Sequence, residues 1–177
     1  MLKKNTHTYS TDRGFTLVEL LLYVSIASFV LLVTSVFLSP LVQSRVKNQT
    51  IAEVEQQGLS LMQSMTHTIR NADAINSPAQ GVADAVTLSV NTIVAGNNPT
   101  IFDLAGTVLQ MKEGAAASVP LSNSRVSVSG LSFSNVSRTG TPGTVRTQFT
   151  LTHVNPEGRN EYDFSKTFIG SATLRQP

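Results

Sequence analysis

The chain has 177 residues, no cysteine and a formal net charge of +2. This length allows one globular domain beside a leader and a membrane segment, and the lack of cysteine excludes disulfides, thiolate metal sites and cysteine nucleophiles. Residues 1–14 carry three basic and one acidic side chain, so their removal would leave a net charge of zero. The remaining basic residues are scattered among acidic ones, and no nucleic-acid partner is predicted.

A short charged leader is followed abruptly by a long apolar run. Apart from Glu19, the residues from Phe15 to Leu38 are apolar or carry a hydroxyl group. About 24 residues, at roughly 1.5 Å each, are enough for a helix to cross the hydrocarbon core of a bilayer. The sequence therefore predicts one transmembrane helix that holds a single carboxylate near its start.

Glu19 needs an explanation, because a charge inside a membrane costs free energy and usually has a partner and a task. One explanation is an interfacial glutamate in the first turn of the helix, which the positive end of the helix dipole stabilises. The other is that Glu19 pairs with an amino group of a neighbouring subunit. An ordinary secretory signal is disfavoured, since the apolar run is too long and no A-x-A-like site follows it.

The start of the chain resembles the amino-terminal signal of type IV prepilins and type II secretion pseudopilins. The resemblance is carried by Lys3 and Lys4 in the leader, the Arg13-Gly14-Phe15 junction, Glu19 and the unbroken apolar run. The resemblance covers about the first third of the chain. It implies cleavage between Gly14 and Phe15 and N-methylation of Phe15. It also implies that Phe15 and Glu19 act in subunit assembly, because the family has a glutamate at the fifth mature position.

The same resemblance implies the partners and the location of the chain. A prepilin peptidase/methyltransferase would process it, and other pilins or pseudopilins, an inner-membrane platform protein and membrane lipid would be its further partners. The leader is expected in the cytoplasm and the head outside it, because three basic residues precede the span and only Arg45 and Lys47 closely follow it. Many major pilins close a carboxyl-terminal loop with a disulfide, and this chain departs from that pattern.

The helix is predicted to continue beyond the membrane as an amphipathic stalk. Apolar or small residues recur at steps of three and four: Ile51, Val54, Gly58, Leu61, Met65, Ile69 and Ala72. One helix is therefore expected from Phe15 to about Ile75. Pro40 lies inside it and predicts a kink or local melting near residues 36–40, or it only marks the membrane boundary.

After Pro78 the pattern changes to the alternation of half-buried strands. Strands are predicted around residues 86–90, 101–104, 107–111, 126–133 and 145–151, and a last one through Tyr162, Phe164 and Phe168. Gly130 shifts the alternation, which indicates a bulge. Residues 139–143 and 155–158 predict turns. One antiparallel sheet with a face on the stalk helix is expected.

The predicted fold is α+β, the pilin-like lollipop that the resemblance implies. Its parts are a leader at 1–14, a transmembrane helix at 15–39, a stalk helix at 40–76 and a β-rich head at 77–177. A minor pilin or pseudopilin is the favoured function, because the stalk end and residues 126–131 resemble minor subunits. A single-pass receptor with an extracytoplasmic binding domain is the alternative. No catalytic constellation, cofactor or metal site is predicted.

Overall fold

The structure is a computed structural model that describes residues 14–175, apart from the side chain of Ser39. The chain divides into two compact units, Met1–Val42 and Gln43–Pro177. Helix α1 (Leu17–Arg70) runs through the boundary between them. Each unit is described by itself.

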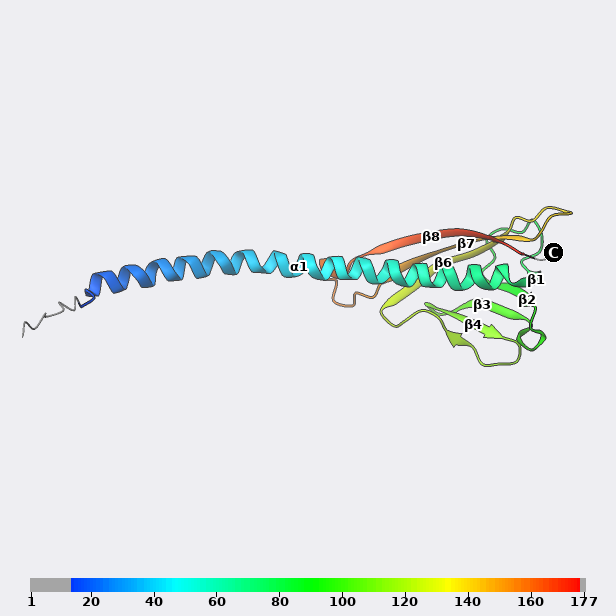
Figure 1. The fold of residues 1–177 in the computed structure, drawn as a ribbon, viewed down its shortest axis with the longest axis horizontal. Coiled ribbons are helices and arrows are strands. Elements are labelled where there is room, and N and C mark those ends of the chain that lie inside the picture. The colour runs from blue at the N-terminus through cyan, green and yellow to red at the C-terminus, as the bar shows by residue number, and fades with distance from the viewer. Residues whose placement is uncertain (1–13, 176–177) are drawn as a thin grey trace, which may run out of the picture. The chain divides into compact units, whose positions relative to one another are not determined.

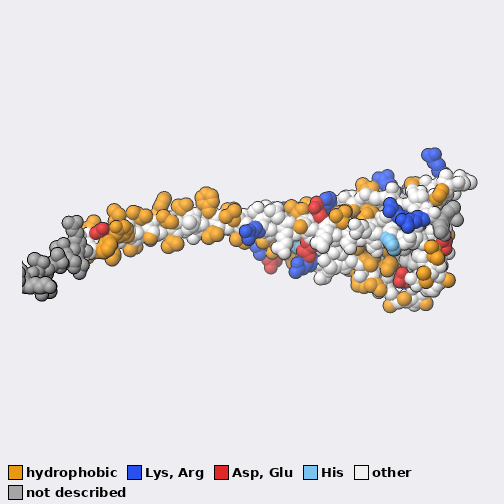
Figure 2. Space-filling view, viewed as in Figure 1, with side chains coloured by type: hydrophobic (Ala, Val, Ile, Leu, Met, Phe, Trp, Pro, Cys, Tyr) orange, Lys and Arg blue, Asp and Glu red, His pale blue; other side chains and the backbone are white. Residues whose placement is uncertain are grey.

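The described part of the first unit consists of the non-helical residues 14–16 and the apolar half of α1. Its large hydrophobic side chains, from Leu17 to Val42, are exposed. An 18-residue window of the helix has a mean hydropathy of 2.4 with none of its residues buried, so length and composition allow it to cross a membrane. Figure 2 shows hydrophobic side chains over most of the visible face of this half of the helix.

In the second unit, α1 buries the predicted stripe from Val54 onward, and Ile51 is half-buried. Val54, Leu61, Met65 and Ile69 are at most 2% exposed. The helix is shorter than predicted, since it ends at Arg70 and not near Ile75. Residues Ala72–Ser77 instead form strand β1, which pairs with the next strand in antiparallel register. Ala72 is buried, as the helical spacing from Ile69 predicted, but it is buried as part of a strand. Burial at this position therefore could not tell a longer helix from a strand.

The head contains two antiparallel sheets, and the prediction of a single sheet is wrong. A five-stranded sheet has the order β1-β2-β3-β4-β5, and a three-stranded sheet has the order β6-β7-β8. In Figure 1 these strands lie alongside the part of α1 that belongs to the second unit. The remaining elements are β2 (Leu88–Thr92), η1 (Ala95–Asn97), β3 (Thr100–Ala105), β4 (Val108–Glu113), β5 (Val119–Pro120), β6 (Val126–Asn135), β7 (Thr144–His153), η2 (Asn160–Tyr162) and β8 (Ser165–Thr173).

Most predicted strands are confirmed, and the phase shift in β6 is a bulge. Its register with β7 changes between Ser129 and Ser132, and Gly130 lies between them at a φ of 58°, where a side chain would be strained. The last strand begins later than predicted. Tyr162 lies in η2, and Phe164 precedes β8.

One core joins α1 to both sheets. Leu88, Phe102 and Leu109 of the larger sheet and Phe133 and Phe149 of the smaller sheet are 0% exposed. They belong to the same buried cluster as the stripe on α1. The head is therefore held together by apolar packing around the helix.

Candidate functional site

The bond predicted to be cut, between Gly14 and Phe15, lies just before the helix. Residues 14–16 are not helical, and both Gly14 and Phe15 are exposed. A Cβ atom added at Gly14 would have no neighbour within 4 Å. A peptidase could therefore reach this bond without first unwinding a helix. Lys3, Lys4 and Arg13, which carry the rest of the predicted signal, lie outside the described residues.

Thr16 caps the start of α1. Its carbonyl oxygen accepts the N–H of Leu20 at 3.1 Å, and its Oγ1 accepts the N–H of Glu19 at 3.3 Å. The first is the opening backbone bond of the helix, and the second satisfies the N–H of Glu19, which has no backbone partner within the helix. Glu19 lies in the first turn beside the positive end of the dipole. The sequence Thr16-x-x-Glu19 fits a capping box, a signal that the sequence analysis did not use.

The carboxylate of Glu19 has a partner on its own helix. The hydroxyl of Tyr23 donates to Oε1 of Glu19 at 3.4 Å. The ring of Tyr23 also meets that of Phe15 edge to face, with centroids 5.9 Å apart and planes at 67°. We call Phe15, Glu19 and Tyr23 the junction cluster. Sequence reasoning missed Tyr23, although its spacing of four residues from Glu19 places both on one helix face.

Glu19 forms no ion pair with any residue in the described range 14–175. The hydrogen bond that its carboxylate accepts comes from an uncharged donor, the phenol of Tyr23. Among residues 14–175, the hydroxyl of Tyr23 is the hydrogen-bond partner of Oε1, and Oε2 has none.

Pro40, the predicted kink, lies inside α1. The chain is helical on both sides of the proline and through it. The bend that a missing backbone hydrogen bond would allow stays a prediction.

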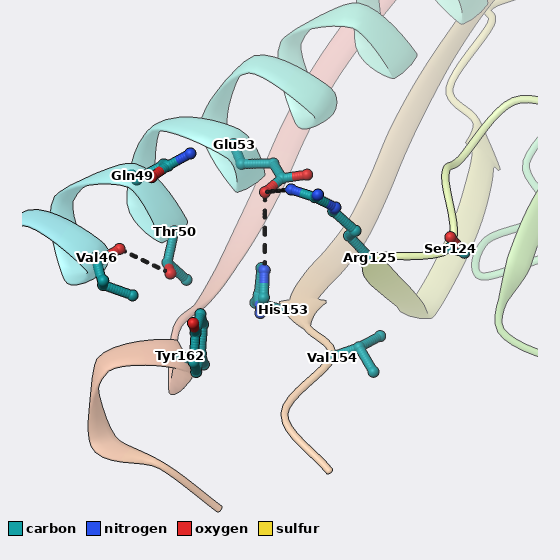
Figure 3. A pocket seen from close by; sticks show the side chains of 9 residues that line it. All are labelled: Val46, Gln49, Thr50, Glu53, Ser124, Arg125, His153, Val154 and Tyr162. Carbon is teal, nitrogen blue, oxygen red and sulfur yellow. Dashed lines mark hydrogen bonds and ion pairs between the residues drawn. The ribbon is translucent and has the colours of Figure 1, made fainter. Parts of the chain in front are cut away.

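A second cluster lies in the head and lines a cavity of about 390 Å³. Figure 3 shows Glu53 of α1 facing Arg125, which precedes β6, and His153 at the end of β7. Oε2 of Glu53 is 3.3 Å from Nη1 of Arg125 and 3.8 Å from Nε2 of His153. The imidazole stacks on Tyr162 with centroids 5.6 Å apart. Three distant segments thus meet at one carboxylate.

The chemistry of this second cluster is that of a structural contact. His153 is largely buried, and its Nδ1 has no hydrogen-bond partner among the residues that the structure describes. Lys47 of α1 donates from Nζ to the carbonyl oxygens of Asn160, at 3.0 Å, and Asp163, at 2.5 Å. These contacts attach the 154–164 loop to the helix. Within residues 14–175, no group of three or more His, Asp or Glu side chains could hold a metal ion.

Arg159 and Glu161 form an ion pair beside Tyr162. A hydrogen bond from its own backbone N–H and a second from Arg159 hold the pKa of Glu161 below its usual value. The same pair raises the pKa of Arg159. The guanidinium of Arg159 also lies 5.4 Å from the centroid of the Tyr162 ring. The Tyr162 ring therefore contacts both Arg159 and His153.

Comparison with known proteins places a recognised signal at the junction cluster. Residues 9–35 match a family model described as the prokaryotic N-terminal methylation motif. No curated protein and no solved structure was found to match the chain. The match covers Gly14, Phe15, Glu19 and Tyr23 and the first part of the exposed apolar helix. The chain therefore carries a prokaryotic N-terminal methylation motif, which supports a type IV pilin-like or pseudopilin subunit.

Proposed function

We propose that the chain is a minor pilin or pseudopilin, a structural subunit and not an enzyme. The observation that carries this proposal is the methylation motif at residues 9–35, at the start of a helix whose first half is apolar and exposed. An exposed apolar helix needs lipid or other helices around it. A filament of such subunits surrounds each helix with other helices.

Processing comes first in the proposed sequence of events. A prepilin peptidase/methyltransferase cuts after Gly14 on the cytoplasmic side and methylates the new amine of Phe15. The accessible, non-helical segment at residues 14–16 supports cleavage at this point. Because the cut precedes the apolar run, α1 stays on the mature protein as its membrane anchor.

Assembly then moves the subunit from lipid into a filament. A platform protein in the inner membrane would bring the subunit to other pilins or pseudopilins. The exposed side chains from Leu17 to Val42 pass from lipid to the surfaces of other helices. Both surroundings are apolar, so the transfer itself changes the hydrophobic free energy little, and close packing must favour the filament.

Glu19 gives this transfer its specificity. A charged side chain at the centre of a membrane helix costs about 2.5 to 3.5 kcal/mol on insertion scales, and less near the interface. The amine of Phe15 on a neighbouring subunit would neutralise the carboxylate. Such a pair forms at one axial offset between subunits, so it would set their register.

The mass of the mature protein tests the proposal. Protein purified from its native membrane is expected to lack residues 1–14 and to carry one added methyl group on Phe15. Gly14→Val is the matched variant, since it changes only the residue before the cut and should leave the leader in place. An intact amino terminus on the unaltered protein would contradict the proposal and would favour a single-pass receptor that keeps its leader.

A further inference from the structure

Tyr23 differs from the other hydroxyl groups in the apolar half of α1. Ser25 donates to the carbonyl oxygen of Leu22, and Thr34 donates to those of Val30 and Leu31. Short side chains of this kind can satisfy their hydroxyl groups on the helix backbone. A phenol is held too far from its own backbone for this, and the hydroxyl of Tyr23 instead donates to Glu19.

The contact satisfies two groups that lipid cannot satisfy. Hydrocarbon offers neither a donor to the carboxylate nor an acceptor to the phenol, and unpaired polar groups there cost free energy. Glu19 and Tyr23 are four residues apart, so they meet on one face of the helix. The rest of the tyrosine ring is apolar and can remain in contact with lipid.

The same ring also contacts Phe15, the residue whose amine would become the new terminus. The edge-to-face arrangement, with centroids 5.9 Å apart, is a favoured geometry for two aromatic rings. One side chain therefore contacts two groups of its own subunit that would each pair with a different neighbour: the carboxylate of Glu19 through its hydroxyl, and Phe15 through its ring.

We propose that Tyr23 is a positioning residue for subunit assembly. Its hydroxyl fixes Oε1 of Glu19 and leaves Oε2 for the amine of a neighbouring subunit. Its ring restricts Phe15 and with it the direction of the new amine. This inference rests on the proposed function, because it assigns to Tyr23 the orientation of the two groups through which its own subunit would pair with its neighbours.

Two variants separate the roles of the hydroxyl and the ring. Tyr23→Phe removes only the hydroxyl and should lower incorporation into filaments about threefold to tenfold, the size expected for one hydrogen bond in a membrane. Tyr23→Leu removes both contacts and should lower incorporation further. Membrane insertion, and cleavage and methylation measured by mass, should stay normal for Tyr23→Phe.

Matched controls come from the same helix. Ser25→Ala removes a hydroxyl that bonds only to backbone, and Phe29→Leu removes an exposed aromatic ring. Both should enter filaments as often as the unaltered subunit. If Ser25→Ala lowered incorporation as much as Tyr23→Phe, the inference would be overturned. The effect would then follow from the loss of any hydroxyl in the helix and not from the contact between Tyr23 and Glu19.

Tyrosine fluorescence gives a readout that filament formation does not affect. The chain has no tryptophan and three tyrosines, so a Tyr9→Phe, Tyr162→Phe background leaves Tyr23 as the only emitter. A carboxylate that accepts a hydrogen bond from a phenol quenches its emission. In phosphatidylcholine vesicles, adding Glu19→Gln to this background should therefore increase the emission, and unchanged emission would overturn the inference.

The outcomes distinguish this inference from the proposed function. Loss of incorporation in both Glu19→Gln and Tyr23→Phe supports the two together. Normal incorporation of Tyr23→Phe beside failure of Glu19→Gln would overturn the role of Tyr23 and leave the proposed pair intact. Normal incorporation of Glu19→Gln would overturn the proposed pair and with it the role of Tyr23, whereas the proposed function is tested separately by the mass of the mature protein.

Discussion

At the scale of single residues, two glycines set how closely α1 approaches β8. A Cβ atom added at Gly58 would overlap the ring of Phe168, and one added at Gly170 would meet the side chain of Met62. Phe168 is stacked on Phe149, with centroids 5.4 Å apart, and Phe149 is 0% exposed. The ring therefore has little room to move away. Gly58 is placed by packing, although glycine is a poor helix former.

Gly58→Ala should lower the free energy of unfolding by about 1 to 2 kcal/mol. Overpacking of a core typically costs about 1 to 3 kcal/mol, and alanine recovers up to about 1 kcal/mol through its higher helix propensity. Denaturant unfolding of the full chain in detergent micelles, followed by circular dichroism, measures the change.

Ser60→Ala, at an exposed position two residues further along α1, is the control and should be neutral or slightly stabilising. Adding Phe168→Leu to Gly58→Ala should restore part of the loss, since the two sites are in contact. A stabilised Gly58→Ala variant would mean that Phe168 moves away without cost.

At the scale of elements, the loop between β7 and β8 is held at both sides. Lys47 of α1 binds carbonyl groups of the loop, and Tyr162 stacks on His153 at the end of β7. Within the loop, Arg159 pairs with Glu161 of η2. Half of the Arg159 side chain is exposed to solvent, which screens the pair, so its contribution to stability should be small but dependent on pH.

The pair of Arg159 and Glu161 should stabilise the head at neutral pH and lose this effect in acid. The pKa of Glu161 in the folded chain is below its ordinary value of about 4.5. The stabilisation is therefore complete above that ordinary value, and it disappears as pH falls through the folded pKa. Thermal unfolding of the full chain and of Glu161→Gln is measured from pH 7 to pH 3. The melting temperature of the unaltered chain should be slightly higher at pH 7, and this difference should vanish at the acid end.

Asp103→Asn is a suitable comparison for the pH series. Asp103 lies in β3, and its side chain has no hydrogen-bond or ion-pair partner among residues 14–175. This variant should not show the pH-dependent difference. If the difference in melting temperature between the unaltered chain and Glu161→Gln grew as the pH fell, the stabilising role of the Arg159–Glu161 pair would be contradicted.

At the scale of the whole molecule, the two units are suited to different solvents. The described part of the first unit exposes its large apolar side chains, whereas the second unit buries most of its own in one core. The second unit resembles an ordinary water-soluble domain in this respect. The first requires lipid or neighbouring helices, and Glu19 is the acidic residue that enters this apolar segment.

Glu19→Ala should abolish incorporation into a filament and leave membrane insertion intact. Removing the carboxylate makes insertion easier, because the cost of a charge in lipid disappears, and it removes the proposed partner of the Phe15 amine. Carbonate extraction of membranes measures insertion, and sedimentation of sheared filaments measures incorporation. Asp103→Ala removes a carboxylate from the head and should change neither, whereas normal incorporation of Glu19→Ala would contradict the proposed pair.

Much of the fold follows from local patterns, and these were predicted correctly. The apolar run, the stripe from Val54 to Ile69 and the alternation in β6 and β7 each depend on neighbours within four residues. The bulge at Gly130 was also visible as a shift of phase. The junction residues Gly14, Phe15 and Glu19 also follow from local sequence, and their roles stay a prediction, whereas the contacts of Tyr23 needed the structure.

The sequence by itself determined the apolar span, the buried face of α1 and the position of the methylation motif. Only the tertiary structure decided that Ala72–Ser77 is a strand, that the head has two sheets, and that Glu53 meets both Arg125 and His153. The physical reason is the range of the interactions. Periodicity records which face of one segment is buried, but strand pairing and ion pairs depend on which distant segments become neighbours.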